Sequence, residues 1–210
     1  MVKISRSARN IKLALLGLLL SAAPARAAVT VTGIEIQSPA GGSYANIVLN
    51  DIIAIREIEI KGNIKTGNFT LAYPDYVNKQ GRSIPQVEIV NEPVAQTIRQ
   101  AIKVGTPPAT DASAGAAQKQ VDFNYKIAKI SLLRQKDRGL KAFVQVLING
   151  AVKVEARVME SKTGLWVAWP GRKDGAGKWH DQFKILNYSA GQKLDNAIIE
   201  KYKVVCSEEP

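Results

Sequence analysis

Basic and aromatic side chains gather in the last third of the sequence, and their chemistry is that of phosphate and base recognition. Arg172 and Lys173 come before a glycine-containing turn, and Lys178 and Trp179 come after it. Each Lys or Arg that meets a phosphate releases counterions from a polyanion, and an aromatic ring beside it can stack on a base. A second basic cluster, beside a predicted strand, comprises Arg134, Lys136, Arg138 and Lys141. We therefore predict that these eight residues bind nucleic acid or another polyanion.

The excess positive charge lies in one part of the chain. The sequence carries 29 Lys and Arg against 18 Asp and Glu, a net charge of +11. Residues 28–105 contain 7 basic and 7 acidic side chains, whereas residues 125–203 contain 16 basic and 7 acidic ones. The alternative to polyanion recognition is a solvated basic surface that keeps the protein soluble or draws it to anionic lipid or cell-wall polymers.

The sequence contains few of the residues that catalysis or metal binding commonly uses. The sequence has one histidine, His180, and one cysteine, Cys206, which excludes a cysteine-rich zinc site and an internal disulfide. His180 adjoins Asp181, but no Ser or Cys nucleophile motif accompanies them, so we interpret this segment as a polar loop. The turn at residues 175–177 lacks the spacing of a phosphate loop. We predict a non-enzymatic protein with no catalytic residues, metal, cofactor or small-molecule substrate.

The first 27 residues have the pattern of an export leader. Four basic residues precede an apolar run of about a dozen residues, shorter than the roughly 20 that span a bilayer. Ala25 and Ala27, followed by Ala28, give the small-x-small spacing of a signal peptidase site. We predict cleavage between Ala27 and Ala28 and export to the periplasm or the cell exterior. The alternatives are an uncleaved anchor, a buried helix, or a cytoplasmic protein whose leader is not functional.

The chain contains an internal duplication. At an offset of 96 residues, nine positions between residues 72 and 102 carry the same amino acid as their counterparts. We predict two small tandem domains, residues 28–104 and 125–203, behind the leader at 1–27 and followed by a tail at 204–210. Residues 105–120 lack large apolar side chains and carry Pro, Gly, Ser and Thr, which predicts a flexible linker over 105–124.

The strand signals of each copy predict an antiparallel β-meander. Apolar runs flank the pairs Asn50-Asp51 and Asn149-Gly150, and such pairs predict type I′ hairpin turns, because both central residues need positive φ. Next comes a strand closed by Pro74 or Pro170. A polar loop follows it, and then a short strand near residues 86–90 or 182–186.

One amphipathic helix is predicted at the end of each copy, which makes the fold class α+β. Ser189 and Gln192 have the spacing of a capping box, with Leu194 and Ile198 following at helical spacing. In the first copy Pro93 indicates the first helical turn. Each copy is near the size at which a lone core is marginal. We therefore expect pairing of the copies, within one chain as a pseudo-dimer or between chains as a homodimer.

Two tryptophans of the second copy lie on one predicted strand. Trp166 and Trp169 are three residues apart, so they face opposite sides of the sheet. The first copy has Thr70 and Tyr73 at these positions. We predict that Trp169 is buried and that Trp166 is partly exposed, and we favour packing of Trp166 over stacking on a base.

Several motifs of the second copy occur in a definite order. They are the Asn149-Gly150 hairpin, Gly-Leu-Trp-Val-Ala-Trp-Pro-Gly-Arg-Lys at 164–173, Gly-Lys-Trp-His-Asp at 177–181 and a helix from about 189 to 202. This order resembles the SpoVG family, also called septation protein or stage V sporulation protein G. The resemblance covers nearly the whole second copy; the first copy matches less well and has Asp75-Tyr76 in place of a small residue and basic ones.

The resemblance implies a small α+β domain that dimerises, binds nucleic acid and regulates septation, sporulation or virulence genes. Members of the family are single cytoplasmic domains, whereas this chain has a predicted leader and a duplication. Our second hypothesis is therefore an exported structural or interaction module of the cell envelope.

Overall fold

The computed structural model describes residues 29–39, 42–78, 80–108, 123–133 and 139–208. The predicted leader with Ala27 and Ala28, most of the predicted linker, and Arg134, Lys136 and Arg138 lie outside the described residues. Within the described part, no helix is both long enough and apolar enough to cross a membrane. We call residues 29–108 the first half and residues 123–208 the second half.

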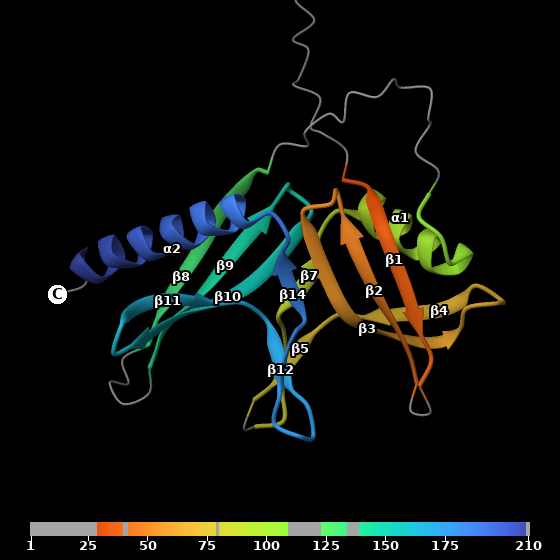
Figure 1. Cartoon of the computed structure of the whole chain (residues 1–210), viewed down its shortest axis with the longest axis horizontal. Helices are drawn as coiled ribbons and strands as arrows, with labels where there is room; N and C mark the ends of the chain where they lie inside the picture. Colours follow the sequence, from red (N-terminus) through yellow and green to blue (C-terminus); the bar gives the residue numbers. More distant parts are fainter. Residues whose placement is uncertain (1–28, 40–41, 79, 109–122, 134–138, 209–210) are drawn as a thin grey trace, which may run out of the picture.

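The two halves have the same order of elements, and the fold is α+β. The first half comprises β1 (Val31–Gln37), β2 (Ser43–Leu49), β3 (Ile53–Asn63), β4 (Asn68–Ala72), β5 (Asp75–Val77), β6 (Ser83–Pro85), β7 (Val87–Ile89) and α1 (Glu92–Val104). The second comprises β8 (Tyr125–Leu132), β9 (Leu140–Ile148), β10 (Val152–Ser161), β11 (Gly164–Ala168), β12 (Gly171–Lys173), β13 (Trp179–Asp181), β14 (Phe183–Ile185) and α2 (Tyr188–Glu208). Figure 1 shows two twisted sheets side by side, each with one helix against it, and two short hairpins that project together from the middle.

The predicted Asn turns are confirmed. Asn50 and Asp51 join β2 to β3 with φ of 52° and 56°, and Asn149 and Gly150 join β9 to β10 with φ of 49° and 65°. Positive φ at both central residues gives a turn whose twist matches that of the strands it connects. These two hairpins form the centres of the two sheets.

The last strand of each half leaves its own meander and joins the other sheet. The first sheet has the order β1-β2-β3-β14, with Phe183 opposite Ile55, and in the second sheet β7 pairs with β10, with Val87 opposite Val154. Strand β3 is longer than β4, so its first residues have a free edge that β14 covers, and β7 covers β10 in the same way. The prediction that the strands near residues 86–90 and 182–186 belong to the meander of their own copy is therefore wrong.

A single hydrophobic core joins the two halves. Its buried members come chiefly from β1–β4, β7 and α1 of the first half and from β9, β10, β14 and α2 of the second. Phe183 is 1% exposed although it sits in a strand of the first sheet, and Val87 is 1% exposed in the second. Because each half supplies apolar side chains to the other, the two halves are packed as one unit.

Both helices begin at an asparagine, at positions that correspond in the duplication. The Asn91 side chain accepts from the Val94 N–H at 3.2 Å, and the Asn187 side chain accepts from the Ala190 N–H at 3.0 Å. Asparagine is favoured here because its side-chain oxygen bonds an N–H that has no partner in the first turn. The predicted start at Ser189 is thus wrong by one or two residues, whereas the place of Pro93 in the first turn is confirmed.

Candidate functional site

The segment predicted as a polar loop is a short hairpin, β12–β13, that holds four of the predicted binding residues. Arg172 faces His180 across the strands and Lys173 faces Trp179. The ammonium of Lys173 lies 5.6 Å from the centre of the Trp179 ring, and Trp179 is 60% exposed. Lys178 is exposed in the turn. The hairpin therefore presents two lysines and an indole on one projecting element.

A carboxylate orders the turn of this hairpin. Asp174 accepts from the backbone N–H groups of Ala176 and Lys178 at 2.9 Å and lies 2.8 Å from Nε2 of His180. These bonds, with that of His180 first, lower the pKa of Asp174 below its usual value. The one histidine of the chain thus stabilises a turn, and its carboxylate partner is Asp174.

The fourth residue of the hairpin cluster, Arg172, is held by the first half of the chain. Its guanidinium forms a two-pronged ion pair with Glu57, with Nη2 3.0 Å from Oε1, and this bond raises the pKa of Arg172 above its usual value. The amide of the buried Gln182 also donates to Glu57 at 3.0 Å. Arg172 thus takes part in the contact between the halves, and its role in polyanion binding stays a prediction.

Glu57 reaches Arg172 because strand β3 contains a bulge. Arg56 and Glu57 both lie opposite the single residue Asn46, and Glu57 has φ of 59°. The Asn46 side chain accepts from the Glu57 N–H at 3.0 Å, which fixes this conformation. The pairing of β9 with β10 is regular at the corresponding place. Sequence reasoning missed Glu57. The one signal in the sequence is that the first copy has an extra residue at this point, which the second copy lacks.

The second predicted basic cluster is not joined to the hairpin within the described residues. Lys141 lies on β9, and its ammonium forms an ion pair with Glu160 of β10 at 2.6 Å. The other three members of that cluster lie outside the described residues. Their part in binding therefore remains a prediction from charge alone.

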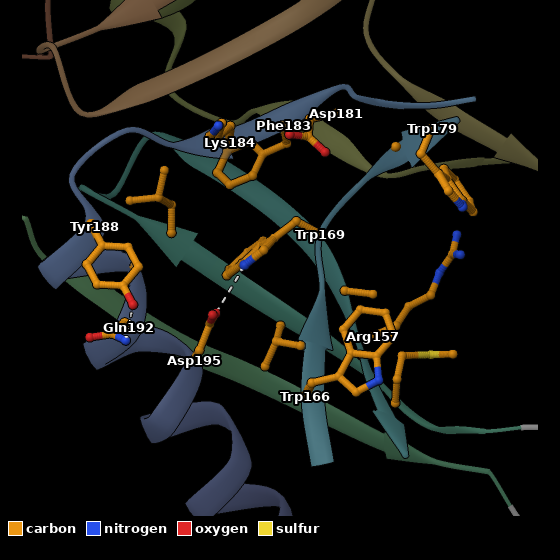
Figure 2. A pocket seen from close by; sticks show the side chains of 16 residues that line it. Arg157, Trp166, Trp169, Trp179, Asp181, Phe183, Lys184, Tyr188, Gln192 and Asp195 are labelled. Carbon is orange, nitrogen blue, oxygen red and sulfur yellow. Dashed lines mark hydrogen bonds between the residues drawn. The ribbon is translucent and has the colours of Figure 1, made fainter. Parts of the chain in front are cut away.

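A groove of about 560 Å³ opens beside the hairpin, between β11, β12–β14 and the start of α2. Figure 2 shows Trp166, Trp179 and Arg157 at one end, Tyr188 and Gln192 at the other, and Trp169 between them. Three of the aromatic side chains are largely free: Trp166 is 47% exposed, Trp179 60% and Tyr188 75%. Sequence reasoning singled out Trp166, Trp169 and Trp179 but did not place them in one groove.

Trp169 forms a fixed wall of this groove. Its indole N–H donates to Asp195 of α2 at 3.0 Å, and its ring lies 5.3 Å from that of the buried Phe183. Burial raises the pKa of Asp195, and the bond from Trp169 opposes that rise. Trp166 is partly exposed as predicted, whereas Trp169 is only partly buried against the core. Both line one groove, so the prediction that they face opposite sides is wrong, because β11 ends at Ala168 before Trp169.

The arrangement can bind planar and anionic groups. The aromatic faces offer stacking surfaces, and Arg157, Lys173 and Lys184 place positive charge around them. Among the described residues, no group of three His, Cys, Asp or Glu side chains is placed to hold a metal ion.

Comparison with known proteins gives one consistent match. The SpoVG family model matches residues 125–204, the second half. A protein of Agathobacter rectalis is 33% identical over 70 residues, which is 33% of this chain and 80% of the relative. One of Desulforudis audaxviator is 30% identical over 80 residues, covering 37% of this chain and 91% of the relative. Both relatives are named for the septation protein SpoVG.

Proposed function

Because this chain belongs to the SpoVG family, we propose that it is a non-enzymatic protein that binds nucleic acid or another polyanion through the second half. The names of the relatives extend this proposal to a role in septation, and the family resemblance extends it to sporulation. The first half, with its identical order of elements, is on this proposal a divergent second SpoVG-like copy. The chain would then be a covalently linked pseudo-dimer.

The observation that carries the proposal is the composition of the β12–β13 hairpin. Lys173, Lys178 and Trp179 are exposed on one projecting element. The corresponding hairpin of the first half, β5–β6, has Val77 and Ser83 in place of Lys173 and Trp179. Phosphate binding needs clustered cations, and an adjoining aromatic ring adds stacking that tolerates any base sequence.

Neutralising the two hairpin lysines should weaken binding and reduce its dependence on salt. In a Lys173→Gln, Lys178→Gln variant, the slope of log K against log salt for a single-stranded oligonucleotide should fall by about 1.4, because each phosphate contact contributes about 0.7. The measurement is fluorescence anisotropy of a labelled oligonucleotide over a series of salt concentrations.

The matched control changes the same charge elsewhere. Lys65 lies in the β3–β4 turn and Lys126 on β8, and both are exposed. A Lys65→Gln, Lys126→Gln variant should retain the wild-type slope. Equal slopes for wild-type protein and the hairpin variant would refute the assignment of the hairpin, and absence of salt-dependent binding in the wild type would refute the function.

We further propose that the protein acts outside the cytoplasm, on the strength of the leader-like sequence at residues 1–27. N-terminal sequencing of protein recovered from fractionated host cells should find Ala28 as the first residue, in a non-cytoplasmic fraction. That result would direct the search to anionic polymers or interaction partners of the cell envelope. A chain that begins at Met1 in the cytoplasm would instead favour a chromosomal or RNA ligand.

A further inference from the structure

Three aromatic side chains in the groove beside the hairpin are exposed and not packed in the core. Trp166, Trp179 and Tyr188 line one cavity of about 560 Å³ and are each between 47% and 75% exposed. Single exposed aromatic residues are ordinary, but several that converge on one concave surface indicate a ligand with flat apolar faces. The Trp169 wall, fixed by Asp195, gives that surface a defined shape.

Three cations lie near these rings, and two carboxylates, Asp181 and Asp195, also line the groove. Arg157 lies 5.5 Å from the centre of the Tyr76 ring, which belongs to hairpin β5–β6 of the first half. Lys173 lies over Trp179, and Lys184 lines the groove between the hairpin and α2. A flat ligand whose negative groups lie toward these cations and away from the two carboxylates fits this combination. Tyr76 makes the first half a contributor to the site, as the support of Arg157.

The corresponding surface of the first half has the opposite character. Glu59 occupies the position that corresponds to Arg157. Glu59 lies opposite Ala72 and Arg157 lies opposite Ala168, and these two alanines correspond in the duplication. At the offset of 96 residues, Trp166 becomes Thr70, Trp179 becomes Ser83, Lys184 becomes Glu88 and Tyr188 becomes Glu92. A pocket of about 210 Å³ lies at part of the corresponding surface, and its charged lining residues are Glu57, Glu59, Asp75, Lys61 and Arg172. None of these five positions in the first half carries an aromatic or basic side chain, so among the described residues we expect this kind of site in the second half alone.

We propose that this groove binds the unpaired bases of a single-stranded nucleic acid, one site per chain, by stacking them on Trp166 and Trp179 while Arg157, Lys173 and Lys184 meet the phosphates. The inference rests on the proposed polyanion-binding function and specifies its ligand. Unpaired bases are required because the faces of bases inside a duplex are already stacked on their neighbours.

The test compares a short oligothymidylate with an abasic oligomer of the same length and charge. Wild-type full-length protein should bind the oligothymidylate more tightly than the abasic oligomer or a duplex, with quenching of tryptophan fluorescence and a stoichiometry of one. In Trp166→Thr and Trp179→Ser variants, which introduce the residues of the first half, the dissociation constant for oligothymidylate should rise about tenfold each. Their affinity for the abasic oligomer should stay at the wild-type value.

The control variant is Tyr125→Ala, which removes an exposed aromatic side chain of β8 that does not line the groove. Thermal unfolding curves should show that all three variants are folded, since each changed side chain is exposed. Equal wild-type affinity for the base-containing and abasic oligomers would overturn base stacking and leave polyanion binding intact. Two sites per chain would overturn the asymmetry. Failure of both oligomers to bind would overturn both proposals. This holds whether or not a neutral oligosaccharide quenches the tryptophan fluorescence.

Discussion

Replacing Phe183 with alanine should lower the free energy of unfolding by about 3–5 kcal/mol, the usual cost of removing a buried aromatic ring. Phe183 is 1% exposed, packs on Trp169 of its own half and pairs with Ile55 of the other. Its loss leaves a cavity where the two halves share their core. We therefore expect both halves to be destabilised together, in a single unfolding transition.

Denaturant unfolding combined with amide hydrogen exchange measures this effect. Amides of β3 in the first half should lose protection to the same extent as amides of β9 in the second. The control is Val104→Ala at the end of α1, where the side chain is 60% exposed and the change should stay within about 0.5 kcal/mol. Loss of protection restricted to the second half would contradict a shared core.

Cutting the chain between the halves should leave them bound to each other. A protease site inserted among residues 109–122 would interrupt the chain outside the strands of both sheets. The halves should stay together after cleavage because β7 and β14 are each paired in the opposite sheet. Separation would expose the edge of β3 at Ile53–Ile55 and the edge of β10 at Val152–Val154, together with buried side chains. The two fragments should therefore co-elute as one species in size-exclusion chromatography.

Each fragment expressed alone gives the complementary result. Since it lacks one strand and part of the core, it should aggregate or pair with a second copy of itself, and mixing the two unfolded fragments should restore the native species on refolding. Two soluble monomeric fragments with cooperative unfolding transitions of their own would show that the halves are independent domains. The uncut protein, carried through the same column, is the reference for size.

Features set by neighbouring residues could be predicted from the sequence. The Asn50-Asp51 and Asn149-Gly150 turns, the strand that Pro170 follows and the apolar face of α2 depend on local φ preferences and on spacing. The family could be predicted as well, because its motifs lie in one continuous stretch of the second half. The partial exposure of Trp166 followed from the alternation of side chains along a strand.

Features that depend on contacts between distant residues could not be predicted. Nothing near Phe183 indicates that β14 pairs with β3 in place of its own meander, because the free edge of β3 is a property of the folded sheet. The ion pair of Arg172 could not be predicted, because its partner Glu57 lies more than a hundred residues away in the sequence. The groove likewise combines residues of β10, β11, the hairpin and α2, and no single segment contains its pattern.

The exchange of β7 and β14 also decides when the protein can fold. The partner strand of Ile53–Ile55 is β14, more than a hundred residues farther along the sequence, so the first sheet cannot be completed until most of the second half has been synthesised. Most chains built from repeated domains fold each domain as it emerges, and contacts between distant residues slow folding. Here the first sheet lacks β14 until that strand has been synthesised, so the two halves complete their folding together.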